Sequence, residues 1–246
     1  MRIAIFNGSP RGACGNTHLM VAPFIEGARE AGAEVENVFL VEKAIGHCRG
    51  CFVCWTQTPG LCVIKDDMAA LLEWAAASDL IVFATPLYVD NVSGIMKQFM
   101  DRMIPLVDPH FERDPSGEYR HVKRHAQIPK IMVIANSGLP EQSHFQVLRA
   151  LFPRIARNMQ SELVAEIYRG GGELLKESSA LLRPRIQRYL GLLRQAGREI
   201  AQDMQLSQKT RAALEKPLLP ARFYMGAANR HWSRLLAKRG RFELPE

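Results

Sequence analysis

Four of the five cysteines in this sequence lie within fifteen residues of one another and could together bind a metal centre. Cys48, Cys51 and Cys54 are each separated by two residues, and Cys62 follows after seven more. A [4Fe–4S] cluster takes four thiolates, three of which can come from one tight loop while the fourth returns from further along the chain. Zinc sites usually combine two separate C-x2-C pairs, so the spacing favours a cluster over zinc. A loop of metal-free thiols is the third alternative.

A second group of residues suited to ligand binding follows the apolar run at residues 3–6. Turn formers occupy residues 7–10, and a helix with Asn16 or Thr17 as its N-cap is expected to begin soon afterwards. Such a loop points backbone N–H groups and small hydroxyls at one spot beside the positive end of a helix, which favours an anion. The candidate residues for this anion site are Ser9, Arg11, Gly15, Asn16 and Thr17.

The loop also lacks two well-known signatures, and this narrows the choice of anion. It has no Gly-Lys-Ser/Thr ending, so a nucleoside triphosphate would have no lysine clamp. It has no Gly-x-Gly-x-x-Gly run either, so the dinucleotide fingerprint is missing. A terminal monophosphate fits these residues better.

The loop residues resemble a known family. Gly8-Ser9-Pro10-Arg11 followed by Gly15-Asn16-Thr17 is similar to the flavin phosphate loop of the flavodoxin-like NADPH-dependent FMN reductases. The cysteine segment makes the chain resemble, more narrowly, the branch that contains the iron–sulfur flavoproteins. The resemblance extends from residue 1 to about residue 170. It implies FMN as cofactor, NAD(P)H as co-substrate and a [4Fe–4S] cluster on the four clustered cysteines.

The resemblance also identifies the residues that would surround the flavin ring. The segment 85–93 offers an apolar and aromatic wall together with small polar residues, and Lys97 and Asp101-Arg102 follow behind it. A third side is expected from the loop after residues 131–135. The ring-binding residues implied are Pro86, Leu87, Tyr88, Val89, Asn91, Ser93, Asn136, Ser137 and Gly138. We name no catalytic acid or base, because the flavin carries the chemistry.

Alternating strands and helices must position these loops. Apolar runs predict strands at 3–6, 35–41, 80–84, 131–135 and 163–168, and helical spacing predicts helices at 17–31, 65–77, 93–103 and 142–158. This alternation is typical of an α/β protein with a doubly wound parallel sheet. By resemblance to flavodoxin-like proteins, the five strands take the order 2-1-3-4-5, which places the ends of the first and third strands side by side.

The sheet order leads to an expectation about the cysteines. The loop that follows residues 35–41 leaves the sheet at the same edge as the phosphate loop. We therefore expect the cysteines to lie within reach of the flavin of the same chain or of a partner subunit. The polar stretch 105–127 is too long for a plain connection, so it is interpreted as an excursion near the active site or a subunit contact.

Composition and charge divide the 246 residues in two. Residues 1–172 are predicted to form the flavodoxin-like FMN-binding domain, and 173–246 a C-terminal helical extension that packs on the domain or on a neighbouring subunit. The extension should contain a long helix at 174–205, interrupted by Pro184, and a last helix at 225–236. Fourteen Lys and Arg against five Asp and Glu give residues 180–246 a net charge of +9. No nucleic-acid docking motif accompanies this charge, so we expect a role in a homodimer or homotetramer instead.

Two functions are compatible with these features. The first is an FMN-dependent oxidoreductase that moves electrons from NAD(P)H or a ferredoxin-like carrier protein to a small acceptor such as a flavin or a quinone. The alternative is a non-enzymatic FMN-binding electron carrier. The sequence contains no apolar run long enough for a membrane span and begins directly with a core strand, so a cytoplasmic protein is expected.

Overall fold

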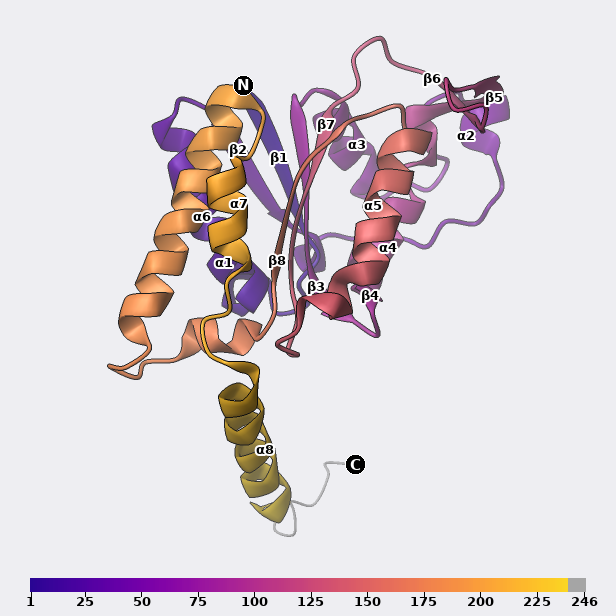
Figure 1. Ribbon diagram of the computed structural model, residues 1–246. Coiled ribbons are helices and arrows are strands. Elements are labelled where there is room, and N and C mark those ends of the chain that lie inside the picture. The colour runs from indigo at the N-terminus through magenta and orange to yellow at the C-terminus, as the bar shows by residue number, and fades with distance from the viewer. Residues whose placement is uncertain (239–246) are drawn as a thin grey trace.

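Five parallel strands run through the centre of the molecule (Figure 1). The computed structural model describes residues 1–238 of the chain. In spatial order the strands are β2 (Glu34–Phe39), β1 (Arg2–Asn7), β3 (Leu80–Tyr88), β7 (Lys130–Asn136) and β8 (Leu163–Arg169). A short strand, β4 (Asn91–Val92), pairs antiparallel with the end of β3. The order confirms the predicted flavodoxin-like sheet.

Helices cover both faces of the sheet, so the strands are buried on both sides and read as unbroken apolar runs. Successive side chains of a strand point to opposite faces. Ile3 and Ile5 accordingly face one core cluster, while Ala4 and Phe6 face the other. One layer contains α1 (Asn16–Glu30) and α6 (Arg183–Asp203), and the other contains α3 (Met68–Ala76), α4 (Gly94–Asp101) and α5 (Gln146–Asn158).

The remaining elements within the described residues are short or lie outside these layers. They are α2 (Val53–Thr56), α7 (Gln208–Glu215), α8 (Ala221–Lys238), the strands β5 (Val107–Arg113) and β6 (Tyr119–Lys123), and the 3-10 turns η1 (Gly12–Cys14), η2 (Leu40–Glu42), η3 (Ile104–Leu106), η4 (Gln142–Phe145) and η5 (Gly172–Lys176).

Helices α1 and α6 approach one another closely because each contributes a glycine. A Cβ atom at Gly27 would lie 1.8 Å from the carbonyl oxygen of Arg194, and one at Gly197 would lie 2.0 Å from the carbonyl oxygen of Phe24. Both distances are shorter than atoms can approach, so any side chain at either position would push the helices apart. Helix α6 is thus part of the core of the sheet domain, where Tyr189 is buried.

The start of α6 corrects one prediction. The helix predicted at 174–205 and interrupted by Pro184 begins instead at Arg183, so that Pro184 lies in the first turn. Proline is well tolerated there, because the N–H that it lacks would have no helical partner anyway. The division of the chain at residue 172 stays a prediction, and residues 239–246 of the predicted extension lie outside the described part.

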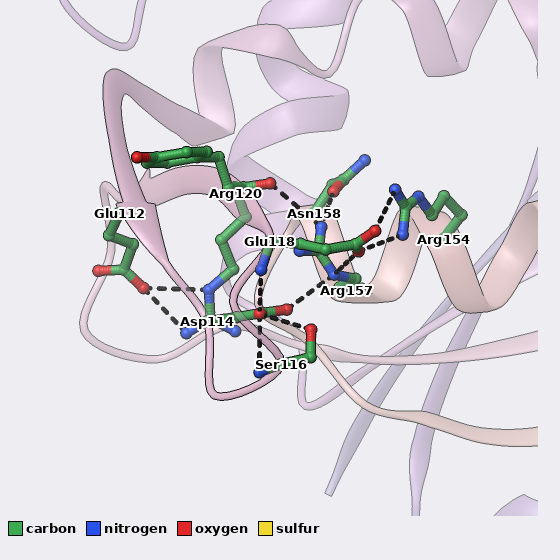
Figure 2. Close-up of polar contacts among 9 residues, drawn as sticks. Glu112, Asp114, Ser116, Glu118, Arg120, Arg154, Arg157 and Asn158 are labelled. Carbon is green, nitrogen blue, oxygen red and sulfur yellow. Dashed lines mark hydrogen bonds and ion pairs between the residues drawn. The ribbon is translucent and has the colours of Figure 1, made fainter.

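The polar stretch 105–127 contains a two-stranded antiparallel sheet of its own, β5–β6, that leans on α5. Figure 2 shows the contacts at its turn. One carboxylate oxygen of Asp114 accepts hydrogen bonds from the Ser116 hydroxyl (2.7 Å) and the Glu118 amide (3.0 Å), and the other pairs with Arg157 of α5 at 2.8 Å. Arg154 of α5 pairs with Glu118 at 2.6 Å. The turn therefore depends on the Asp114 carboxylate, and its docking on α5 depends on Asp114 and Glu118 together.

We expect this docking to weaken in acid. The hydrogen bond from the Ser116 hydroxyl, together with those from the Glu118 amide and Arg157, lowers the pKa of Asp114 from 3.8 to about 2. Because the folded-state pKa is depressed, the stabilisation is present above pH 3.8 and is lost as the pH falls through about 2. In the parent protein, hydrogen exchange of the β5–β6 amides, measured relative to their intrinsic exchange rates, should accelerate as the pH falls across this range.

The Asp114→Asn variant should show faster exchange already at neutral pH and a weaker dependence between pH 4 and pH 2, because Glu118 still pairs with Arg154 of α5. Glu112→Gln is the matched control, because Glu112 pairs with Arg120 inside the hairpin and not with α5 (Figure 2). An unchanged acid profile in Asp114→Asn would contradict the assignment.

The C-terminal helices behave differently from one another. Helix α7 packs on β8 and α6, and Leu214 is buried in the core of the sheet domain. Helix α8 projects away from the body of the molecule (Figure 1). None of the helices in residues 1–238 is both long and apolar enough to cross a membrane.

Candidate functional site

The loop between β1 and α1 forms a cradle where β1 ends. Gly15 is the N-cap of α1, so the predicted N-cap at Asn16 or Thr17 is wrong by one residue. Within the described residues, the amides of Asn16 and Thr17 make no hydrogen bond. These amides form the positive end of a 15-residue helix. The cradle therefore offers free donors to an anion, as predicted.

Three predicted side chains line this cradle and one does not. Ser9, Asn16 and Thr17 are all buried, and the side-chain oxygen of Asn16 has no partner among residues 1–238. Arg11 instead lies at the exposed rim, where its guanidinium pairs with Glu173 at 3.2 Å. An arginine on the rim can still add positive charge near a phosphate, but its side chain is held by a carboxylate.

Glycine is required at two positions of the cradle. A Cβ atom at Gly15 would lie 2.2 Å from the Ser9 hydroxyl oxygen, and one at Gly8 would lie 2.7 Å from the Cβ of Met96 in α4. The loop is thus pressed between its own serine and helix α4. The tight fit leaves no room for a side chain at either glycine.

The loop after β7 reaches the cradle directly. The Asn136 side-chain amide donates to the Thr17 hydroxyl oxygen at 2.7 Å, and both residues are buried. Since the Thr17 oxygen accepts this bond, its hydroxyl hydrogen is free to donate to a ligand. The backbone N–H of Ser137 bonds to the Arg169 carbonyl at 2.9 Å, which fixes the loop to β8. The loop after β7, predicted as the third side of the site, therefore contacts the cradle between β1 and α1.

The turn between β3 and β4 supplies another side of the site. Val89 and Asp90 both have positive φ angles, of 49° and 56°, a backbone found in tight hairpin turns. A β-branched residue rarely adopts it, and the Val89 side chain is 98% exposed at the tip. A strained, exposed apolar tip is a feature often found where a ligand binds.

Other predicted residues of this segment support the turn. Thr85 accepts a hydrogen bond from the Ser93 backbone N–H at 3.0 Å, and the Ser93 hydroxyl donates to the Gly8 carbonyl at 2.6 Å. Ser93 is also the N-cap of α4. Asn91 accepts a bond from the Val92 amide next to it, and Tyr88 is half-exposed. Ser93 therefore joins the ring segment to the phosphate cradle.

A cavity of about 530 Å³ opens between the two ring-side loops and helix α8. Four predicted residues line it, namely Leu87, Val89, Ser137 and Gly138, whereas Pro86, Tyr88, Asn91, Ser93 and Asn136 do not. The sequence did not indicate the other lining residues, which are Asp90, Leu139, Glu173, Tyr224, Met225, Ala228, Asn229 and Trp232. The apolar stripe at helical spacing in 225–236 was the available signal, but it did not indicate where the helix packs.

Tyr224 anchors α8 at this cavity. Its hydroxyl donates to the Gly138 carbonyl at 2.6 Å, and the residue is buried. Burial, with a smaller effect from the charge of Glu173, raises the pKa of Tyr224. The tyrosine thus stays protonated and keeps donating at any physiological pH. The first turns of α8 form the outer wall of the cavity.

The four clustered cysteines border one small cavity, which they share with Ile104. Cys48 and Cys51 are exposed, and Cys54 and Cys62 are half-buried. Burial, with smaller effects from the negative charges of the other three thiols, raises the pKa of Cys54. Four thiols around one space are the right donor chemistry for an iron–sulfur cluster. In the described part of the chain, however, no three His, Cys, Asp or Glu side chains converge closely enough to hold a metal ion.

The place of the cysteines corrects the expectation that they share an edge with the phosphate loop. The Trp55 indole donates to the Ile104 and Val107 carbonyls, so the cysteine loop lies against the start of β5. Figure 1 shows α2 beside β5–β6, at the other end of the molecule from α8. Only the first residues of the loop lie near the edge that was predicted. The loop runs back along α4 because the groups that it contacts lie there.

Comparison with known proteins agrees with this architecture. Residues 1–121 match the family described as NADPH-dependent FMN reductase. An iron–sulfur flavoprotein of Archaeoglobus fulgidus is 40% identical over 98 residues, which make up 40% of this chain and 43% of that protein. One of Methanosarcina thermophila is 33% identical over 111 residues, or 45% of this chain and 56% of that protein. The chain spans about half the length of the curated relatives it matches.

A solved structure extends the likeness beyond the matched segment. The NAD(P)H:quinone oxidoreductase from Methanothermobacter marburgensis has a TM-score of 0.61 at 17% identity, covering 81% of this chain and 96% of that one. At this identity the likeness concerns the fold, which is flavodoxin-like in both. The resemblance that the loop residues indicated is confirmed by the match of residues 1–121 to the NADPH-dependent FMN reductase family.

Proposed function

We propose that this protein is an FMN-dependent oxidoreductase that transfers electrons from NAD(P)H to a small flat acceptor such as a quinone or a free flavin. The observation that carries the proposal is the meeting of three loops at one edge of the sheet. The cradle before α1 contacts the loop after β7 through Thr17 and Asn136, and contacts the β3–β4 segment through Ser93. The proposal is supported by a cavity of about 530 Å³ on the side of these loops, which together with the cradle suits a ligand with a phosphate at one end and a ring at the other.

Each part of FMN would meet a different set of residues. The phosphate would bind the free amides of Asn16 and Thr17 and the hydroxyls of Ser9 and Thr17, with Arg11 at the rim. The ring would lie in the cavity, where the backbone groups of Ser137 and Gly138 can contact its polar edge. When bound, FMN supplies hydride acceptance from NAD(P)H and electron transfer to the acceptor.

The walls of the cavity suggest the chemical class of the acceptor. Leu87, Val89 and Leu139 form an apolar floor, and Met225 and Trp232 of α8 close the outer side. The Trp232 side chain, 61% exposed beside these apolar residues, is suited to stack on a flat ring. This composition favours an aromatic, uncharged acceptor.

We also propose that Cys48, Cys51, Cys54 and Cys62 hold a [4Fe–4S] cluster. Support comes from the four thiols around one cavity and from relatives named iron–sulfur flavoproteins. When bound, such a cluster passes single electrons, which would suit exchange with a ferredoxin-like carrier. Clustered free thiols also fit a reducing compartment such as the cytoplasm.

Steady oxidation of NADPH or NADH by the purified protein, with FMN and a quinone present, tests the proposal. We expect consumption that depends on both the protein and the quinone. A protein that binds FMN but shows no turnover with quinones, free flavin or azo dyes would instead be the electron-carrier module.

The role of α8 gives a prediction of its own. A chain that ends at Pro220 removes α8 but keeps α7, which belongs to the core. We expect it to retain FMN but to show a KM for an aromatic quinone raised by roughly tenfold, because it loses the stacking of one aromatic side chain, worth about 1 kcal/mol or more. Steady-state kinetics with the quinone, and with ferricyanide as an acceptor that needs no stacking, measure this.

Trp232→Ala should reproduce the change and Trp232→Phe should largely restore the parent value. Equal quinone KM values in parent, truncated chain and Trp232→Ala would rule out the wall function. Light scattering of the truncated chain also tests the predicted homodimer or homotetramer, because a smaller assembly would place α8 in the subunit interface.

A further inference from the structure

The loop that carries the four cysteines, residues 43–67, is held at its two ends as well as at its middle, where the Trp55 indole donates to the Ile104 and Val107 carbonyls. The backbone N–H of Ala44 donates to the Asp67 carboxylate at 2.8 Å, and the Asp67 N–H donates back to the Ala44 carbonyl at 3.0 Å. One residue pair further in, the Gly46 N–H donates to the Asp66 carboxylate at 2.7 Å. Both ends of the loop therefore meet at Asp66 and Asp67.

Arg102 contacts both ends of the loop at this junction. Its guanidinium is bidentate on the Asp66 carboxylate, at 2.7 and 3.0 Å, and also donates to the Gly46 carbonyl at 2.7 Å. The Arg102 side chain is 1% exposed and that of Asp66 is 9% exposed. A buried pair with this geometry is costly to break, since either charge left alone would remain without a counter-charge.

The guanidinium also lies beside Cys62. Burial lowers the pKa of Arg102, but the hydrogen bonds that the guanidinium donates to Asp66 and the negative charges of Cys62 and Asp66 more than offset this, so the pKa is raised. The side chain is thus a permanent cation between the two ends of the loop and one of its thiols. The resemblance placed Arg102 behind the flavin ring segment, whereas the structure turns it away to the cysteine loop.

Arg102 follows directly after α4, and the other end of α4 is fixed just as firmly. Ser93, the N-cap, accepts a bond from the Met96 N–H at 3.2 Å and donates to the Gly8 carbonyl of the phosphate loop at 2.6 Å. The eight residues Gly94–Asp101 of α4 extend about 12 Å at the helical rise of about 1.5 Å per residue. One rigid helix thus connects the phosphate loop to the cysteine loop.

We propose that Arg102 and Asp66 are positioning residues that clamp the cysteine loop to the C-terminal end of α4, and so set the distance between the four thiols and the flavin site. The proposal rests on the proposed function for the identity of the two sites it connects. The clamp itself needs neither ligand. Together with the Trp55 contacts, it explains why a loop with only one short helix, α2, and two exposed cysteines lies in a defined place.

Two variants test the clamp. Arg102→Lys keeps the charge but cannot make the bidentate contact, and Asp66→Asn keeps the shape but removes the counter-charge. In each, we expect the amides of residues 44–67 to exchange hydrogen at least about tenfold faster, and alkylation of the half-buried Cys54 and Cys62 to accelerate by a similar factor, because a broken buried pair strongly favours local opening. Amides outside the loop should exchange at the parent rate.

Arg198→Lys is the matched control, because Arg198 pairs with Glu30 at 2.9 Å on the exposed side of α1 and α6. It should change nothing. Exchange that rises everywhere in the chain, or that stays at the parent rate in residues 44–67 of both variants, would overturn the proposal. If Arg102→Lys does not fold, Asp66→Asn decides the matter.

The test of the clamp gives a result that does not depend on whether the proposed function is correct. Exchange and alkylation are measured on the purified chain without FMN or iron, so the clamp is judged even if the parent protein binds neither. FMN affinity should stay within about twofold of the parent in both variants, since the phosphate cradle lies at the opposite end of α4. Where the parent contains iron, both variants should contain less, with FMN content unchanged.

Discussion

Replacing Thr17 with valine is expected to weaken FMN binding by roughly tenfold to 150-fold. The Thr17 oxygen accepts the Asn136 amide at 2.7 Å, which leaves the hydroxyl hydrogen to donate to the phosphate. Valine keeps the shape of threonine but has no hydroxyl. Losing a hydrogen bond to a charged group costs about 1.5 to 3 kcal/mol, and each 1.4 kcal/mol is about tenfold in Kd. Titration of the apoprotein with FMN, followed by flavin fluorescence, measures the effect.

Riboflavin is the control ligand for this variant, because it has the same ring and no phosphate. Its affinity should be the same in the parent protein and in Thr17→Val. Thr17→Ser keeps the hydroxyl and should bind FMN nearly as tightly as the parent. If Thr17→Val binds FMN like the parent, or loses riboflavin to the same degree, Thr17 does not hold the phosphate.

Replacing Cys51 with serine is expected to abolish the iron–sulfur signals while leaving FMN bound. Protein purified without oxygen should contain about four iron and four sulfide per chain, with a broad visible absorption that bleaches on reduction. Cys51 belongs to the group of four cysteines around one cavity, and loss of one thiolate leaves one corner of the cube without a protein ligand. Flavin content should not change, because the phosphate cradle and ring loops come from other segments. Chemical iron analysis and absorption spectra before and after reduction measure the effect.

Cys14→Ser is the matched control for iron content, since Cys14 is an exposed cysteine outside the cysteine loop. Its iron content should equal that of the parent. A parent protein that contains no iron after anaerobic purification would favour the metal-free thiol loop, and the proposed enzyme would then be a simple two-electron FMN reductase. Iron retained in full by Cys51→Ser would mean that Cys51 is not a ligand.

The sequence by itself determined the individual strands and the loop after the first of them, because each depends on residues that are close together in the chain, while the strand order came from the family resemblance. Unbroken apolar runs such as residues 3–6 indicate strands buried on both faces, and the alternation with helices permits few strand orders. The cradle from Ser9 to Thr17 needs only a strand, a turn and a helix start. Its one error, an N-cap at Gly15 instead of Asn16 or Thr17, is a shift by a single position.

Only the tertiary structure decided what the remaining residues contact, because those partners are far apart in the chain. Tyr224 reaches the Gly138 carbonyl across 86 residues, which places the start of α8 beside the cavity that Leu87 and Ser137 line. Arg102 reaches the Gly46 carbonyl across 56 residues, which places the cysteine loop at the far end of α4. An apolar stripe or a lone arginine in the sequence indicates that its side chains will contact another segment. Which segment that side chain contacts depends on how distant parts of the chain pack. The local pattern of one segment does not indicate which other segment lies beside it.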